Sequence, residues 1–503
     1  MRRWGLVGIL VLAAVLRFYR LGQVPYGLAW DEAAFAYNGW SISLWNRDEF
    51  ANFLPLVFKS YGDYKPPLFV YLLAGYYKIF GFNEQLVRVY SALAGIVSVM
   101  GMFLLAKELF PKKRWLSLLA AFLTGISPWA IHFSRIGFEA NIALPFVIYG
   151  AWLLLLGRRW KLAWPLAALV LGLSLYLFHN AKIVVPVLLL GFGFSYRSSP
   201  VVFSRRALVS LILLVLLALP IAYTTVYKGL GERGRQTLIF FRENKRQSTP
   251  KITSELVRNV GNQWSLDFWI RGKDVHSPRH AASGFGVLYR IELPFLIVGL
   301  VALLLGRRKE QLVLWWLVAG FLPAFVTHGV PHTVRSLLAL PAVVMLVAIG
   351  VDYSVVFLAK HGRHLWLKVG SVGWVIILTL ELMVYLRYYY TSYAQMSATA
   401  FQYGYKEVFA EVVKRQKSVD KIVFTDAYGQ PYIYALIYQR IEPQQFLFGA
   451  LNQYEFHAVG WPTTQLNRLF VATPEEISPT DPAVVETVKV PGSDQVVWVI
   501  AET

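Results

Sequence analysis

Long apolar segments separated by short basic clusters occupy most of this chain and limit its fold more than any other feature. Inside a bilayer every backbone polar group must be satisfied within the protein, and uninterrupted apolar segments of this kind satisfy it as helices. Hydrophobic residues make up 56% of the chain and charged residues 16%, below the quarter that soluble domains usually carry. The sequence therefore predicts an all-α polytopic membrane protein. The candidate segments are 4–19, 68–81, 86–109, 115–131, 141–157, 161–178, 182–196, 207–227, 286–305, 311–328, 333–358 and 366–388.

The basic clusters predict the topology, because positively charged loops stay in the cytoplasm. An even number of spans must separate two cytoplasmic clusters, yet three apolar segments lie between the N-terminal Arg2-Arg3 pair and the cluster at 112–114. Segment 68–81 is short for a span, so we expect a helix that lies at the outer interface. About eleven spans then remain, with loops 20–85 and 228–285 on the outer side.

The remaining composition excludes several classes of protein. The net charge of +20 lies largely in clusters between apolar segments, where it reads as a topology signal, so no nucleic-acid partner is expected. Cysteine is absent, which rules out disulfides, thiolate metal sites and cysteine nucleophiles. We interpret the N-terminal segment as an uncleaved first span. The predicted location is the cell membrane, crossed several times.

The last part of the chain has a soluble composition and is expected outside. The predicted division is a transmembrane module at 1–389 and a small extracytoplasmic α/β domain at 390–503. Apolar runs rich in β-branched residues predict its strands, and an apolar run after a proline predicts a helix. The strands are expected at 420–425, 467–472 and 495–500, and the helix at 431–439.

Two adjacent acids follow the first apolar segment, in Trp30-Asp31-Glu32-Ala33. A carboxylate at the membrane surface can accept a proton from a group that attacks a membrane-bound substrate. Asp31 could equally be the N-cap of the following helix, and the two roles are compatible. A third acid, Glu139, lies in the expected short outer loop at 132–140. Asp31, Glu32 and Glu139 are the candidate catalytic residues.

Cations and aromatic residues gather on the same predicted outer face. Lys65, Arg135 and Arg335 are the candidate ligands of a phosphate group, because cations hold phosphate while a lipid tail stays in the bilayer. Lys65 precedes Pro66-Pro67 and could instead extend to lipid headgroups. Arg135 could pair with Glu139, four residues on. The candidate substrate-binding residues are Tyr37, Tyr61, Tyr64, His179 and His332.

A metal site is not predicted, although two histidines lie near each other. His328 and His332 would share one face of a helix, but Gly329 and Pro331 between them favour a turn. A divalent metal is possible and is not required. No cofactor is expected.

The order of these motifs resembles one glycosyltransferase family. A first span is followed by Trp-Asp-Glu-Ala, by Tyr64-Lys65-Pro-Pro-Leu, by a segment at 79–84 and by Arg88. Val334-Arg335-Ser-Leu-Leu-Ala-Leu-Pro341 comes late in the chain. This order resembles GT-C glycosyltransferases of the protein O-mannosyltransferase type, and most of all their bacterial branch with the lipid A aminoarabinose transferase. The resemblance covers roughly residues 1–390.

The resemblance implies transfer of a sugar from a polyprenyl-phosphate donor to an acceptor on the outer face, with inversion at the anomeric carbon. Asp31 matches the family's catalytic aspartate, and Glu139 falls where a second-loop acid is expected. Lys65 matches the lysine that contacts the lipid phosphate. The tyrosine before it departs from the acid of the aminoarabinose branch, which puts that sugar and any associated metal in doubt.

Two other functions remain open at this point. A transporter or flippase of an anionic lipid would use the same cations, but it should carry charges in mid-span and related halves. A ligase that moves a whole glycan would keep the same chemistry with a different donor. The expected partners are the donor, the lipid bilayer, and an acceptor that is a glycan, a lipid or a protein.

Overall fold

The computed structural model describes residues 2–199, 202, 204–227, 231–243, 245–306, 308–462 and 466–503. The first residues of the long outer loop, 228–230, therefore lie outside the described part. The chain forms two compact units. The first contains residues 1–19, 62–69 and 89–388, and the second contains residues 20–61, 70–88 and 389–503.

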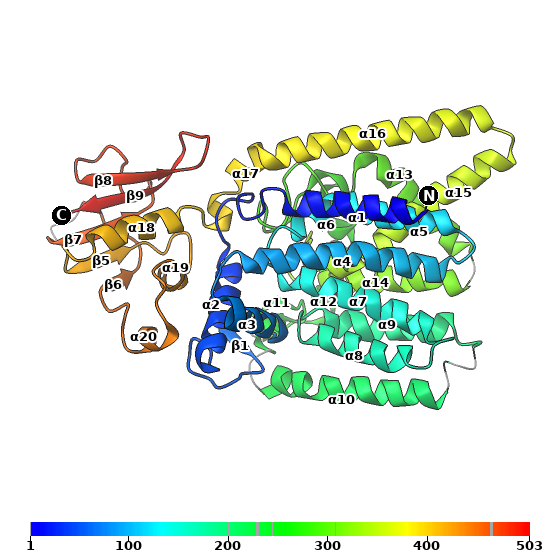
Figure 1. Ribbon diagram of the computed structural model, residues 1–503, viewed down its shortest axis with the longest axis horizontal. Coiled ribbons are helices and arrows are strands. Elements are labelled where there is room, and N and C mark those ends of the chain that lie inside the picture. The colour runs from blue at the N-terminus through cyan, green and yellow to red at the C-terminus, as the bar shows by residue number, and fades with distance from the viewer. Residues whose placement is uncertain are drawn as a thin grey trace. The chain divides into compact units, whose positions relative to one another are not determined.

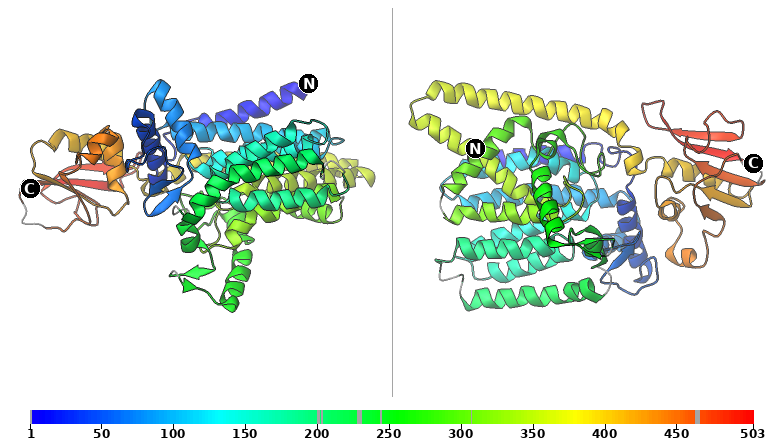
Figure 2. Two further views of the ribbon diagram at one scale, coloured as in Figure 1. Left: turned by 90° about the horizontal axis from the view of Figure 1, so that it is seen from below. Right: turned by 180° about the vertical axis from the view of Figure 1, so that it is seen from behind.

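The first unit is a bundle of apolar helices that lie side by side (Figures 1 and 2). Each of the apolar segments predicted from the sequence contains a helix. The helices in these segments are α1 (Arg2–Phe18), α3 (Leu68–Phe80), α4 (Leu86–Leu109), α5 (Arg114–Ile126), α7 (Glu139–Leu156), α8 (Ala163–Leu175), α9 (Ala181–Ser195), α10 (Arg205–Tyr227), α13 (Leu293–Leu304), α14 (Leu312–Phe325), α15 (Leu340–Lys360) and α16 (His364–Tyr390). Most of α3 and the ends of α4 and α16 belong to the second unit. Shorter elements are β2 (Asp63–Lys65), α6 (Pro128–Phe133), α11 (Glu232–Thr237), β3 (Phe241–Arg242), β4 (Lys245–Arg246), α12 (Thr249–Gln263), η2 (Asp267–Arg271), η3 (Arg290–Glu292), η4 (Arg308–Gln311) and η5 (Leu337–Ala339).

Five helical segments among the described residues are long and apolar enough to cross a membrane by length and composition. They are Leu86–Leu109, Glu139–Leu156, Arg205–Tyr227, Leu337–Lys360 and His364–Met396. The other apolar helices are shorter, and α3 has 13 residues. At 1.5 Å per residue that length covers about 20 Å, less than the hydrocarbon core of about 30 Å. The protein is thus a membrane protein with several candidate spans, and the count of eleven stays a prediction.

Buried arginines connect helix ends within the bundle. Arg17, near the end of α1, donates from Nη1 to the carbonyls of Ala13 at 3.1 Å and Gly125 at 2.9 Å. Its Nε donates to Ser134 Oγ at 3.2 Å. The side chain therefore satisfies a carbonyl that the end of α5 would otherwise leave without a partner, and it ties α1 to α5.

Two glycines allow α13 and α15 to pack closely. A Cβ at Gly299 would lie 1.9 Å from the carbonyl oxygen of Leu346, and one at Gly350 would lie 1.9 Å from that of Phe295. Such contact between backbones is typical of small residues in membrane helices, where close van der Waals packing replaces the hydrophobic effect. Any larger residue at either position would separate the two helices.

The basic clusters that predict the topology also form ion pairs. Lys113 lies 2.5 Å from Asp352 Oδ2 on α15, which is buried. Arg158, after α7, lies 3.5 Å from Glu108 Oε1 at the end of α4. These clusters therefore also hold neighbouring helix ends together.

The second unit combines the first loop with the C-terminal part of the chain. The predicted transmembrane module at 1–389 includes that loop, whereas contacts group most of it with residues 389–503. Its further elements are α2 (Trp30–Trp45), β1 (Phe58–Ser60), α17 (Ser392–Met396), η6 (Thr399–Phe401), α18 (Tyr405–Arg415), β5 (Lys421–Phe424), α19 (Pro431–Tyr438), α20 (Pro443–Leu447), β6 (Tyr454–Phe456), β7 (Arg468–Ala472), β8 (Val484–Lys489) and β9 (Val496–Glu502).

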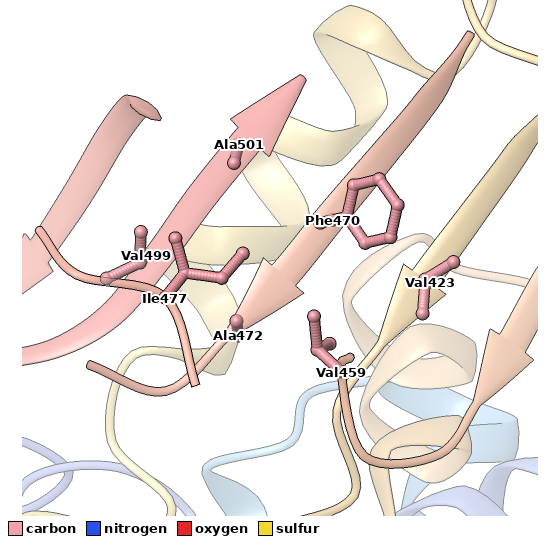
Figure 3. Close-up of a cluster of buried hydrophobic side chains, with 7 residues drawn as sticks. All are labelled: Val423, Val459, Phe470, Ala472, Ile477, Val499 and Ala501. Carbon is pink, nitrogen blue, oxygen red and sulfur yellow. The ribbon is translucent and has the colours of Figure 1, made fainter. Parts of the chain in front are cut away.

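The C-terminal sheet confirms the predicted strands and helix and adds β6 and β8. Its order is β6-β5-β7-β9-β8, with β5 parallel to β6 and β7 and with β9 antiparallel to β7 and β8. One face carries a small apolar core that includes Val423, Phe470 and Val499 (Figure 3). Residues of the opposite parity, Phe424 and Trp498, contact Tyr405 of α18, as the period of two in a strand requires.

Candidate functional site

Helix α2 presents the two adjacent acids at its first turn. The helix begins at Trp30 and its N-cap is Ala29, so the alternative of Asp31 as the N-cap is wrong. Instead Glu32, the third residue of the helix, accepts the Ala29 N–H at Oε2 with a distance of 2.9 Å. Both acids lie in the first turn, where the helix dipole stabilises negative charge.

Glu32 forms a buried ion pair with Arg88. The Arg88 Nε lies 2.8 Å from Glu32 Oε1, the Nη2 lies 2.9 Å from Oε2, and both side chains are fully buried. Arg88 also donates to the carbonyls of Pro25 and Gly27. This bidentate arrangement fixes the Glu32 carboxylate in an ion pair. Of the two adjacent acids, Asp31 is therefore the candidate base.

The predicted tyrosines Tyr37 and Tyr61 hold α2 in place within the second unit. Tyr37 is buried and its hydroxyl donates to the Ile441 carbonyl at 3.1 Å. The Tyr61 hydroxyl donates to the Trp30 carbonyl, beside Asp31, at 3.1 Å. The two side chains thus position the start and the body of α2.

Sequence reasoning missed another buried acid of the second unit, Glu49. It is fully buried and accepts from Asn38 Nδ2 at 3.1 Å and from the Tyr432 hydroxyl at 3.3 Å. Burial raises the pKa of Glu49 to about 7, and the hydrogen bond from Asn38 opposes that shift. Glu49 follows Asp48 in a polar loop, and nothing in that local pattern indicates burial.

In the first unit a single turn at 179–182 joins two predicted phosphate-binding segments. The ring of His179 hydrogen-bonds through Nε2 to the Tyr64 carbonyl at 2.9 Å, next to Lys65. Asn180 Nδ2 donates to the Arg335 carbonyl at 2.9 Å. The structure therefore brings the segments of Lys65, His179 and Arg335 to one place, as the outer-face prediction requires.

The same turn leads into an apolar cavity of about 790 Å³ among α8, α9 and α10. Its walls are mostly aliphatic and include Leu171, Leu189 and Leu214. Lys182, at the start of α9, lines it and donates to Thr225 Oγ1 of α10 at 3.1 Å. A long apolar chain with a negatively charged end fits such a cavity.

Arg135 and Glu139 lie at other helix ends of the first unit. Arg135 is fully buried and its Nη1 donates to the carbonyls of Leu16 and Arg17 at 3.1 and 3.0 Å. This contact caps the end of α1, so we do not include Arg135 in the proposed phosphate site. Glu139 is the first residue of α7 and is 8% exposed.

The two histidines of the loop after α14, His328 and His332, contact different residues. His328 contacts Glu255 Oε1 at 2.6 Å and the Phe241 carbonyl at 2.9 Å. Gly329 between them has a φ of +72°, which forms the turn expected from the sequence. His332 instead lies beside His276 and His280, with ring centroids 5.4 and 5.2 Å away. His276 and His280 are not among the residues predicted from the sequence, although Asp274, His276 and His280 form an Asp-x-His-x-x-x-His pattern.

Comparison with known proteins supports the family resemblance. Residues 64–225 match the family model described as dolichyl-phosphate-mannose-protein mannosyltransferase. No curated protein sequence matches the chain.

Solved structures show the same fold. ArnT from Cupriavidus metallidurans bound to undecaprenyl phosphate aligns over 98% of this chain and 97% of its own, with 14% identity and a TM-score of 0.53. The apo state of that protein has a TM-score of 0.55 at 13% identity, with the same coverage. The archaeal oligosaccharyltransferase AglB from Archaeoglobus fulgidus, in complex with an inhibitory peptide and a dolichol-phosphate, aligns over 86% of this chain at 15% identity and a TM-score of 0.51. This chain spans 63% of that protein.

The family match covers Lys65, Arg135, Glu139 and His179, and the fold match covers nearly the whole chain. The GT-C resemblance predicted from the motifs is therefore supported by two findings: residues 64–225 match the dolichyl-phosphate-mannose-protein mannosyltransferase model, and the chain has the fold of ArnT.

Proposed function

We propose that the protein transfers a sugar from a polyprenyl-phosphate donor to an acceptor at the extracytoplasmic face of the cell membrane. The observation that carries this proposal is the turn at 179–182. It connects the strand of Lys65 to the loop of Arg335 and continues into an apolar cavity lined by Lys182. A phosphate with a polyprenyl tail needs this combination of cations and an apolar cavity.

The donor binds through its phosphate and its tail. Lys65 is 5% exposed, and its strand and the loop of Arg335 both hydrogen-bond to the turn that leads to Lys182. The polyprenyl chain occupies the cavity among α8, α9 and α10. A fixed cation near the lipid boundary attracts a phosphate more strongly than it would in water, because the effective dielectric constant there is lower. ArnT bound to undecaprenyl phosphate and AglB bound to a dolichol-phosphate have the same fold, which supports a lipid phosphate as the donor end.

The reaction is one displacement at the anomeric carbon. Asp31 accepts the proton of the acceptor hydroxyl while the acceptor oxygen bonds to the anomeric carbon. The bond from that carbon to the phosphate oxygen breaks, and polyprenyl phosphate leaves with the electron pair, stabilised by Lys65 and Arg335. Direct displacement inverts the anomeric configuration. The phosphate is a good leaving group, so this step requires no metal.

The other acids have supporting roles. Glu139, at the first turn of α7, positions the acceptor or the base. Glu32 is a positioning residue, because its pair with Arg88 holds the turn that carries Asp31. His179 positions Lys65 through the Tyr64 carbonyl.

A donor panel tests the proposal. Purified protein in lipid nanodiscs is incubated with polyprenyl-phosphate monosaccharides and a mixture of glycan, lipid and peptide acceptors, and released polyprenyl phosphate is measured. We expect consumption of at least one monosaccharide donor, with formation of a product of inverted configuration. Consumption of a lipid-linked oligosaccharide alone would make the protein a glycan ligase. Movement of intact donor across a vesicle bilayer without consumption would overturn the proposal in favour of a flippase.

A further inference from the structure

A cluster of one acid and three histidines lies in the outer loops of the first unit. Asp274, His276 and His280 follow η2, and His332 follows α14. Asp274 and His280 are each 9% exposed and His332 is 4% exposed. One potential ligand atom from each of these three residues lies within 4.8 Å of the others. The imidazole ring of His276 lies 4.9 Å from that of His280 and 5.4 Å from that of His332.

Hydrogen bonds from the surrounding backbone hold this cluster in place. Asp274 Oδ2 accepts the Thr333 N–H at 2.6 Å and the Thr333 hydroxyl at 2.8 Å. Asp274 Oδ1 accepts the His276 N–H at 2.7 Å. The His332 N–H donates to Oε1 of Gln263, a fully buried side chain, at 3.0 Å. The two loops are therefore fixed to each other before any ligand binds.

One atom in this arrangement has no hydrogen bond. Nδ1 of His280 is buried and lies 3.5 Å from Asp274 Oδ1, but it has no hydrogen-bond partner. A buried polar atom without a partner costs stability and calls for an explanation such as an ion. The Arg335 N–H donates to Nδ1 of His332 at 3.3 Å, a long contact that a stronger ligand would replace.

Imidazole nitrogens and a carboxylate oxygen are donors that divalent transition metals bind in proteins. We propose that Asp274, His280 and His332 bind a divalent transition metal, with His276 as a fourth ligand. Three imidazole nitrogens and one carboxylate oxygen match the donors and the coordination number of zinc. Ligand atoms around tetrahedral zinc lie roughly 3.3–3.5 Å apart, so the side chains need to close by about 1 Å. The ion joins the loop after η2 to the turn that carries Arg335. Its role is structural, so the proposal does not depend on the transfer reaction.

Metal content of the whole protein tests this proposal. The chain is purified with a tag that contains no histidine, stripped with a chelator, incubated with zinc and desalted, and the bound metal is measured by mass spectrometry. We expect about one zinc per chain. Cobalt in place of zinc should give the intense visible absorption bands of a four-coordinate site.

Variants separate this site from weak surface binding. His280→Gln and Asp274→Asn should each lower zinc affinity at least tenfold and remove the cobalt bands. His361→Gln changes an exposed histidine outside the cluster and serves as the matched control with unchanged binding. If a variant does not fold, the stoichiometry and cobalt spectrum of the unmodified protein decide the question. Absence of zinc after loading, or equal binding in all variants, would overturn the proposal.

Discussion

Charged side chains are used differently in the first loop of the second unit and in the outer loops of the bundle. In the first loop the carboxylate of Glu32 is cancelled by two hydrogen bonds from Arg88, deep in the unit. In the bundle Lys182 donates to Thr225, and Arg335 donates to Thr327 at 3.0 Å and to the His328 carbonyl. These acceptors are neutral groups, whereas the partner of Glu32 is a cation. The comparison teaches that burial alone does not identify a reactive charged side chain. The charge of its hydrogen-bond partner also decides whether the side chain has a structural role.

The largest expected effect concerns the buried ion pair of Glu32 and Arg88. Arg88→Met leaves the Glu32 carboxylate buried without its cation, and we expect a loss of about 3–5 kcal/mol of stability. The double variant Glu32→Gln with Arg88→Met should recover part of that loss, because no buried charge remains. Thermal unfolding in detergent and limited proteolysis measure both. Lys406→Met is the control, since the exposed pair with Glu84, 3.7 Å apart, should contribute at most about 1 kcal/mol. Equal effects in the two single variants would contradict the structural role of Arg88.

The second prediction concerns the acid beside that pair. Asp31→Asn keeps the shape of the side chain but cannot accept a proton, so transfer should fall about a hundredfold or more while donor binding changes little. Single-turnover transfer and donor binding measure the two quantities separately. Asp494→Asn, an exposed acid of the same unit, is the control. Substantial transfer by Asp31→Asn at neutral pH would move the base to Glu139.

The third prediction uses Glu49, which accepts hydrogen bonds from the neutral side chains of Asn38 and Tyr432. Its pKa in the folded protein is raised to about 7 from an ordinary value of 4.5. The folded state therefore binds the proton more tightly, and the associated stability is full below pH 4.5 and is lost as the pH rises through 7. The loss should be on the order of 1–3 kcal/mol. Thermal unfolding at pH 5 and pH 8 should show this difference, and Glu49→Gln should reduce it. An unchanged difference in Glu49→Gln would assign the pH dependence to other groups.

The smallest expected effect concerns the cations of the bundle. Lys65→Ala should raise the donor KM and lower kcat, with a combined loss of roughly tenfold, because negative charge on the leaving phosphate grows in the transition state. Lys65→Arg should recover only part, since guanidinium and ammonium differ in geometry. Lys245→Ala changes an exposed lysine of the same unit and should have no effect. If neither parameter changes in Lys65→Ala, Lys65 anchors headgroups, and the phosphate site must be sought at Lys182 or Arg335.

Much of the fold was predictable, because membrane helices and strands depend on local patterns. A run of apolar residues must form a helix in lipid, and short apolar runs rich in β-branched residues correctly predicted the strands β5, β7 and β9. The motif order around Lys65 predicted the family whose model residues 64–225 match. The same patterns could not group the first loop with the C-terminal part, because that grouping depends on contacts such as the Tyr37 hydroxyl with the Ile441 carbonyl, 404 positions apart.

The sequence by itself thus determined the membrane class, the order of the helices, three strands of the C-terminal sheet and the candidate cations. Only the tertiary structure decided which partners the charged groups meet. Glu32 meets Arg88 across 56 positions, Asp274 meets Thr333 across 59, and Glu49 is buried by Tyr432 from 383 positions away. Such pairs carry no local signal, because Coulomb forces and burial depend on distance in space, whereas hydropathy and periodicity depend on neighbours along the chain.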